Sequence, residues 1–184
     1  FKKNNFIYGN TTSKNYLTKN YININLKSLK SKFKSSTKEY SNKLVKEINS
    51  NKFDLVEIHN RPLILFNLIK KTECRFIFYF HNDPLSMKGS KTISERLLIL
   101  KNVEKIIFVS EWVRKRFFLD LDKKLSTKTE VIYPSVNKQK ATKKYEFIVF
   151  VGRLNYSKGY DIFKKTISKI LNEFPKWKAF SVGD

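Results

Sequence analysis

Short apolar runs that alternate with segments of helical periodicity are the feature that most constrains the fold of this chain. Several runs of four to six residues are almost free of polar side chains, and apolar positions three and four residues apart follow them after a polar turn. Short apolar runs favour strands, whereas that spacing is typical of one face of a helix. Their alternation predicts an α/β fold with a parallel sheet. The predicted strands are 53–59, 75–80, 105–109, 130–133, 147–151 and 179–184, and the predicted helices are 36–50, 62–71, 93–100, 111–119 and 161–174.

The most apolar of these strands, 75–80, predicts burial on both faces of the sheet, and 105–109 and 147–151 follow the same pattern. A parallel sheet buried on both faces needs helices on both sides, so we expect a doubly wound arrangement. In the last helix, one side is predicted to carry the apolar surface, formed by Ile162, Phe163, Thr166, Ile167, Ile170 and Leu171.

Residues 137–146 are polar, charged and without periodicity, which predicts a linker. We therefore expect a first domain at 1–136 and the start of a second at 147–184. The chain begins at Phe1 without a methionine, so we expect the first domain to be incomplete at its amino end. A strand–helix–strand piece as small as 147–184 cannot bury both faces of its sheet, so we expect the second domain to be truncated.

The charge of the chain is strongly positive, because 38 Lys and Arg face 16 Asp and Glu, for a net charge of +22. Such a charge is typical of proteins that bind nucleic acid or anionic lipid. Only six of the basic residues are Arg, the residue that makes bidentate contacts to phosphate and guanine. Lys, Asn and Ile are abundant together, as AT-rich codons would give, which favours genome composition as the cause. A basic binding module without chemistry stays open as the alternative function.

Composition also argues against two further classes of protein, integral membrane proteins and proteins with internal disulfides or cysteine metal sites. No window reaches the roughly 18 consecutive apolar residues of a membrane-spanning helix, which argues against an integral membrane protein. The one cysteine, Cys74, cannot form an internal disulfide, and it has no Cys or His at metal-ligand spacing. We therefore predict a reducing compartment and no metal site.

Polar residues follow the predicted strands at their carboxyl ends, where open α/β sheets bind ligands. Both histidines of the chain occur there. The candidate site residues of this edge are His59, Asn60, Arg61, His81, Asn82 and Ser110.

A second candidate site lies between strand 147–151 and the last helix. Gly152 lets a ligand approach the backbone closely, and Arg153 and Lys158 place two cations near the amino end of that helix. This arrangement suits a diphosphate. The glycine spacing, with Gly159 as the second glycine, differs from a P-loop and from the dinucleotide-binding fingerprint.

These residues resemble a known family. Gly152-Arg153-Leu154, then Lys158-Gly159, an amphipathic helix and a strand ending Val182-Gly183-Asp184 are similar to the donor-domain entry of family-four retaining glycosyltransferases of the GT-B fold. Upstream, Phe80-His81-Asn82, Phe108-Val109-Ser110 and 131–137 occur in the order found in that family. At 134–137 this chain has Pro-Ser-Val-Asn where relatives often have Asn-Gly-Val-Asp, so the local turn differs.

The resemblance implies a Rossmann-like acceptor domain at 1–136 and the start of a Rossmann-like donor domain at 147–184. It implies that Gly152, Arg153, Lys158 and Gly159 hold the diphosphate of a nucleotide sugar. His81 would act near the reacting sugar, and His59, Asn60, Arg61, Asn82 and Ser110 would line the acceptor side. The glycine-rich loop and the carboxylate pair of the family would lie outside this sequence, so we expect 1–184 alone to be inactive.

The activity that the resemblance implies is transfer of a hexose-type sugar with retention of configuration, without metal or redox cofactor. The nucleotide sugar would be the co-substrate, and a glycan or lipid-linked molecule would be the acceptor, in surface polysaccharide or lipopolysaccharide synthesis. It implies a cytoplasmic location, with contact to the inner face of the membrane where the acceptor is lipid-linked, and no nucleic-acid partner.

Overall fold

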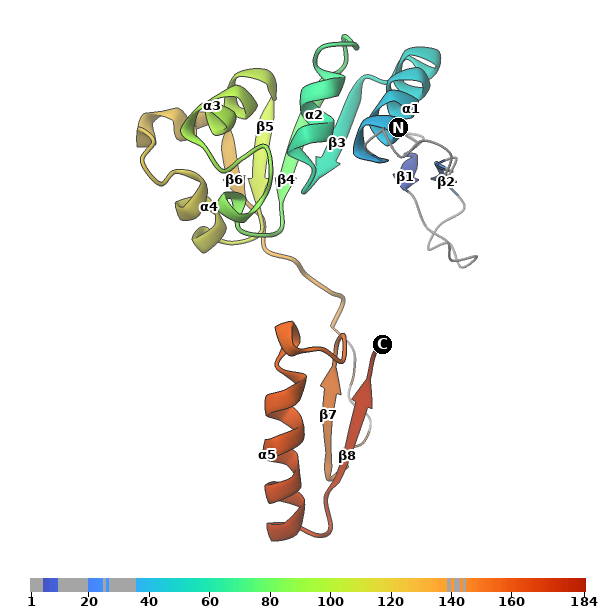
Figure 1. The fold of residues 1–184 in the computed structure, drawn as a ribbon, viewed down its shortest axis with the longest axis vertical. Helices are drawn as coiled ribbons and strands as arrows, with labels where there is room; N and C mark the ends of the chain where they lie inside the picture. Colours follow the sequence, from blue (N-terminus) through green and yellow to red (C-terminus); the bar gives the residue numbers. More distant parts are fainter. Residues whose placement is uncertain are drawn as a thin grey trace. The chain divides into compact units, whose positions relative to one another are not determined.

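The computed structural model describes residues 5–9, 20–24, 26, 36–138, 140, 143 and 145–184. The chain divides into two compact units, Phe1–Ser135 and Val136–Asp184, shown as ribbons in Figure 1. None of the described residues in the predicted linker 137–146 belongs to a helix or strand. That the two units are an acceptor and a donor domain stays a prediction.

The first unit is built on a parallel sheet of four strands in the order β3-β4-β5-β6 (Figure 1). All three neighbouring pairs are parallel, which confirms the predicted α/β class. A separate parallel pair, β1 and β2, comes first in the chain. The strands are β1 (Ile7–Gly9), β2 (Tyr21–Asn23), β3 (Leu55–His59), β4 (Arg75–Phe80), β5 (Lys105–Phe108) and β6 (Thr129–Val131).

The helices of this unit begin at residues that cap or start helices. Pro62 occupies the first turn of α2, where its missing N–H breaks no helical bond. Thr92 and Glu95 form a capping box at the start of α3, and the Ser110 hydroxyl accepts a hydrogen bond from the Val113 N–H at the start of α4. All four predicted helices are confirmed, although α2 ends three residues and α4 two residues earlier than predicted. They are α1 (Ser36–Asn51), α2 (Pro62–Leu68), α3 (Ile93–Asn102) and α4 (Glu111–Phe117), with short 3-10 helices η1 (Pro84–Ser86) and η2 (Lys123–Lys128).

The core lies against one face of the sheet. In register, Phe78 stands between Ile58 of β3 and Ile106 of β5, and Phe80 stands beside Phe108. These side chains form one buried cluster with residues from all four helices. Consecutive parallel strands placed in sequence order, joined by right-handed crossovers, put their helices on the same side.

In the residues that the structure describes, the opposite face of the sheet is open along β3 and partly open along β4. The face carries Leu55, Glu57 and His59 of β3, all exposed, and half-buried Ile77 and Tyr79 of β4. The predicted burial on both faces is therefore wrong for 75–80, whereas it is confirmed for 105–109, because Ile106, Ile107 and Phe108 of β5 are all buried. The doubly wound arrangement stays a prediction. Which face of 75–80 is buried depends on the side from which the helices pack, and a run of apolar residues in the sequence does not reveal that side.

A buried arginine, Arg96, connects two segments on the helical side of this unit. Arg96 of α3 is only 2% exposed, although it carries a charge. Its Nη1 donates to the Lys91 carbonyl at 2.9 Å, and its Nη2 donates to the Leu119 carbonyl at 2.7 Å. The side chain thus ties the loop before α3 to the segment after α4.

The second unit is a parallel pair of strands with one helix. Phe150 of β7 packs against Tyr160 and Phe163 of α5, with ring centroids 5.1 and 5.2 Å apart. A short 3-10 helix, η3, precedes α5. The elements are β7 (Phe147–Val151), η3 (Tyr156–Lys158), α5 (Tyr160–Glu173) and β8 (Lys178–Val182).

Two expectations for the second unit are wrong. Strand 147–151 is present but not buried on both faces, because α5 covers only one of them. The other face exposes Phe147, Val149, Val151, Phe180 and Val182. The apolar side of α5 is also narrower than predicted, since Ile162 is 65% exposed and Thr166 is exposed as well.

Candidate functional site

The candidate site of the first unit lies at the carboxyl ends of neighbouring strands. His59 ends β3, His81 directly follows β4, and Ser110 follows β5 by two residues. Because the strands are parallel and adjacent, their carboxyl ends share one edge of the sheet (Figure 1). This edge is where open α/β sheets bind ligands.

Three rings lie nearly parallel at this edge. His59 and Tyr79, cross-strand partners on the open face, stack with centroids 4.5 Å apart and an interplanar angle of 9°. The His59 and His81 rings lie 5.1 Å apart at 16°, and Nδ1 of His59 is 2.8 Å from Nε2 of His81. The last distance is a hydrogen bond between the imidazoles, so the rings meet edge to edge. The structure therefore brings together both histidines that the sequence singled out.

Asn60 fixes the backbone beside these rings. Its φ of 54° lies in the left-handed region, which asparagine tolerates better than most residues. Its N–H donates to the Tyr79 carbonyl at 2.9 Å, and its Oδ1 accepts the His81 N–H at 2.7 Å. The side chain thus closes the turn after β3 onto the end of β4.

The electrostatics at His59 favour its neutral form. Partial burial of the His59 ring lowers its pKa from the ordinary 6.5, and the neighbouring charge of His81 lowers it further. Glu57, whose Oε2 lies 3.9 Å from Nε2 of His59, opposes this shift. His59 consequently stays uncharged to a lower pH than a free histidine.

The loop that follows His81 is held by an ion pair. Arg116 of α4 contacts both carboxylate oxygens of Asp83, through Nε at 3.2 Å and Nη2 at 3.1 Å. Asp83 Oδ1 also accepts the Leu85 N–H at 3.0 Å and so caps η1. The Arg116 hydrogen bonds, more than any other contact, hold the pKa of Asp83 below its ordinary 3.8.

Substituting Asp83 by asparagine is expected to lower the free energy of unfolding by about 1–2 kcal/mol at pH 7, since it removes the ion pair and weakens the cap. The folded-state pKa of Asp83 is depressed, so its contribution is present above pH 3.8 and disappears as the pH falls through the folded value. Urea unfolding between pH 2 and 7 measures this. The variant should differ from the wild type near neutrality and converge with it in acid, and a constant difference across the range would contradict the assignment.

The other predicted residues of this edge have varied surroundings. Ser110 is engaged as the cap of α4. Arg61 precedes α2 and Asn82 lies in the loop after His81, and both are exposed. Within the described residues, neither of these two side chains makes a hydrogen bond or ion pair. They stay predicted site residues without a structural partner.

In the second unit, the predicted diphosphate loop connects β7 to α5. Gly159 has a φ of 73° and ends η3, a conformation that glycine adopts without strain. Arg153 and Lys158 are exposed, and in the part of the chain that the structure describes their side chains have no hydrogen bond or ion pair. No side chain caps the amino end of α5. Two unpaired cations thus lie in the loop that leads into an uncapped helix start, as the sequence suggested for an anion.

The close approach at Gly183 was missed from the sequence alone. A Cβ at this position would collide with the carbonyl oxygen of Gly152, so only glycine fits at 183, where the ends of β7 and β8 approach each other. Tyr79, Glu57 and the Asp83–Arg116 pair were missed as well. Period-two alternation places Glu57 and His59 on one face, but only the strand register shows that Tyr79 lies beside them.

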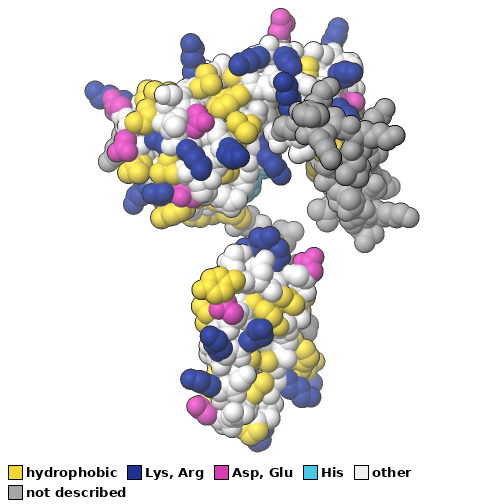
Figure 2. Space-filling view, in the orientation of Figure 1, with side chains coloured by type: hydrophobic (Ala, Val, Ile, Leu, Met, Phe, Trp, Pro, Cys, Tyr) yellow, Lys and Arg dark blue, Asp and Glu magenta, His cyan; other side chains and the backbone are white. Residues whose placement is uncertain are grey.

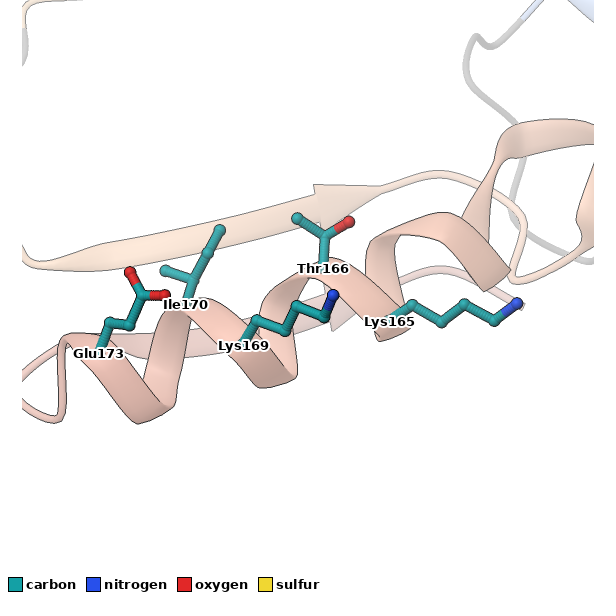
Figure 3. Close-up of a pocket in the computed structure, with 5 residues that line it drawn as sticks. All are labelled: Lys165, Thr166, Lys169, Ile170 and Glu173. Atoms are coloured by element: carbon teal, nitrogen blue, oxygen red, sulfur yellow. The ribbon is translucent and has the colours of Figure 1, made fainter.

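A shallow hollow on α5 lies apart from these residues. It is lined by Lys165, Thr166, Lys169, Ile170 and Glu173, which lie along one side of the helix (Figure 3). None of them is a predicted site residue. Among the described residues, no three His, Cys, Asp or Glu side chains are grouped to hold a metal ion, and no helix is long and apolar enough to cross a bilayer.

Comparison with known proteins relates this chain to glycosyltransferases. The chain is 27% identical over 158 residues to the protein named "Putative glycosyltransferase YtcC" of Bacillus subtilis strain 168. The match covers 74% of this chain and 38% of that relative, so the chain spans well under half of its length. The pattern of Glycosyltransferase Family 4 matches residues 18–140, which include the whole sheet edge with His59, His81 and Ser110. With two thirds of its length matched, and with the parallel sheet that the first unit shows, the chain belongs to Glycosyltransferase Family 4.

Proposed function

We propose that the protein transfers a hexose-type sugar from a nucleotide sugar to a glycan or lipid-linked acceptor, in surface polysaccharide or lipopolysaccharide synthesis. In this reaction the bond from the anomeric carbon to the diphosphate oxygen breaks, and a bond to the acceptor oxygen forms on the same face of the sugar. The hydroxyl proton of the acceptor leaves with the nucleoside diphosphate. The reaction takes place in the cytoplasm, against the inner face of the membrane where the acceptor is lipid-linked.

The single observation that carries this proposal is the pair of unpaired cations, Arg153 and Lys158, in the loop that leads into the uncapped start of α5. Negative charge builds on the leaving diphosphate as the glycosidic bond breaks. Cations and helix N–H groups beside the diphosphate stabilise that charge more in the transition state than in the bound donor. The transfer then needs no metal ion to neutralise the leaving group.

The sheet edge of the first unit carries the other residues proposed to act in the reaction. His81 contacts the donor sugar near the anomeric centre, while Asn60, Arg61, Asn82 and Ser110 line the acceptor side. The exposure of His81 and Asn82 suits contact with a substrate. Hydrogen bonds from such groups position the sugar rather than move a proton.

Replacing Arg153 or Lys158 by alanine in the intact protein is expected to lower kcat/KM for sugar transfer by about 10²–10³-fold, as the loss of a transition-state contact does. Transfer is measured with UDP-, GDP-, ADP- and dTDP-linked hexoses. Binding of the matching nucleoside diphosphate is measured by calorimetry, and we expect it to weaken by about tenfold or more. Lys165→Ala serves as the matched control, since this cation lies on α5, outside the loop 152–159 (Figure 3).

An equal effect of Lys165→Ala and Arg153→Ala would contradict a localised diphosphate site. It would favour the basic binding module instead. In such a module many lysines each contribute to binding, and the affinity for DNA or anionic vesicles falls steeply with salt. In the view of Figure 2, Lys and Arg side chains are spread over both units among hydrophobic ones.

A further inference from the structure

The contact between the two histidines fixes where their protons lie. Nδ1 of His59 and Nε2 of His81 are 2.8 Å apart, so one nitrogen donates and the other accepts. A neutral imidazole carries a single N–H, and its position determines which nitrogen is left as an acceptor. The direction of this one hydrogen bond therefore sets the tautomer of both rings.

Glu57 determines the direction of the hydrogen bond between His59 and His81. Its Oε2 lies 3.9 Å from Nε2 of His59, on the nitrogen that does not face His81. If His59 donated from Nδ1, the lone pair of its Nε2 would face a carboxylate, which is repulsive. If His59 instead carries its proton on Nε2, that N–H faces the negative charge, and Nδ1 is free to accept. The carboxylate thus selects the second arrangement, in which His81 donates from Nε2.

The surroundings hold this arrangement in place. Tyr79 stacks on His59 with ring centroids 4.5 Å apart, which restricts rotation of the His59 ring, and it lies parallel to His81 with centroids 6.1 Å apart. Asn60 fixes the backbone of His81 through its N–H at 2.7 Å. In the described part of the chain, Nδ1 of His81 has no hydrogen-bond partner.

We propose that His59 is a positioning residue for His81: it accepts the Nε2–H of His81 and so leaves Nδ1 of His81 as the acceptor that meets a sugar hydroxyl during transfer. This role rests on the proposed function, in which His81 contacts the donor sugar. His59 and Glu57 act through His81 and do not themselves touch the substrate.

The arrangement has a pH limit. The groups that face His59 are Glu57 on β3, Tyr79 on β4 and His81 after β4. Burial, together with Glu57 and Glu130, raises the pKa of the Tyr79 hydroxyl, which stays neutral. Protonation of His59 would place an N–H opposite the Nε2–H of His81 and break the contact. Because the fold lowers the pKa of His59 from its ordinary 6.5, His59 is protonated, and the contact is lost, at a lower pH than a free histidine would allow.

The first test reads the tautomers directly. The intact protein is labelled with ¹⁵N-histidine, and long-range ¹H–¹⁵N spectra are recorded at pH 7.5, with His59→Asn and His81→Gln to assign the signals. We expect both rings to carry their proton on Nε2. A spectrum with the His59 proton on Nδ1 would overturn the inference, whatever the activity.

The second test separates two contributions of His59: its hydrogen-bond acceptor, Nδ1, and the stacking of its ring on Tyr79. His59→Asn keeps an acceptor near the position of Nδ1, whereas His59→Phe keeps the ring on Tyr79 but has no acceptor. We expect His59→Phe to lower kcat by about tenfold with little change in donor KM, and His59→Asn to recover most of that loss. Equal kcat values in the wild type and His59→Phe, or a loss in His59→Asn as large as in His59→Phe, would contradict the role.

Glu57→Gln removes the negative charge that selects the tautomer of His59 and leaves the size of the side chain unchanged. We expect a mixture of His81 tautomers and a kcat between those of the wild type and His59→Phe, whereas Glu130→Gln, on the same open face, leaves both unchanged. Unaltered tautomers in Glu57→Gln would overturn the selection by Glu57. A wild-type protein that transfers no sugar from any donor would overturn the proposed function, and with it the role in transfer, while the spectra still report the proton positions independently.

Discussion

Replacing Phe117 by alanine is expected to lower the free energy of unfolding of the first unit by about 3–5 kcal/mol. Phe117 is fully buried at the end of α4. Its ring lies 5.3 Å from those of Phe80 and Phe108, which belong to neighbouring strands, and 5.3 Å from Phe118. Its loss would leave a cavity between α4 and the sheet and would remove three ring contacts at once.

Denaturant unfolding measures this loss in the intact protein. Trp112 reports on the first unit, and a Trp177→Phe background removes the tryptophan of the second unit. The control is Leu98→Ala, because Leu98 is 40% exposed, and we expect a change within about 0.5 kcal/mol. A loss below about 1 kcal/mol for Phe117→Ala would show that the ring is not part of a packed core.

Replacing Arg96 by alanine is expected to destabilise the same unit by about 3 kcal/mol. Arg96 is 2% exposed, and burial lowers the pKa of its guanidinium while Asp120 opposes the shift, yet the group stays protonated. The alanine variant loses two charge-assisted hydrogen bonds to carbonyl groups and leaves a cavity. The segments before α3 and after α4 would then no longer be joined by the hydrogen bonds of Arg96.

Two further substitutions show which part of the side chain matters. Arg96→Lys keeps the charge, but one ammonium lacks the forked geometry that reaches both the Lys91 and Leu119 carbonyls, so we expect most of the loss to persist. Arg96→Met restores much of the volume without burying a charge, so we expect partial recovery. Unfolding followed by Trp112 fluorescence compares the three variants. Full recovery in Arg96→Met would show that packing, and not the hydrogen bonds, is the contribution of this residue.

Helices and strands were predictable where a local chemical signal was present. Pro62, Thr92 with Glu95, and Ser110 start helices because their own backbone or side chains satisfy the first turn, and this information lies within four residues. The strands that hold His59 and His81 were found by their apolar runs. Their adjacency then placed both histidines at one edge, as parallel sheets require.

The covered face of the sheet was not predictable in the same way. Phe76, Phe78 and Phe80 alternate with Arg75, Ile77 and Tyr79, and all except Arg75 look apolar in the sequence. Which of the two sets is buried depends on the side from which α1–α4 pack, and this follows from the order of the strands. The same holds in the second unit, where Ile162 looks like a core residue and is exposed.

By itself, the sequence determined the α/β class, the helix starts and the candidate residues at the strand ends, because these depend on local periodicity and on residues that are close in the chain. Only the tertiary structure decided that His59 meets His81, that Tyr79 stacks on His59, and that Arg116 holds Asp83. Each of these contacts joins residues 20 or more positions apart, whose meeting depends on strand register and helix packing. Register is a property of the paired strands together, so no single segment of the chain contains it.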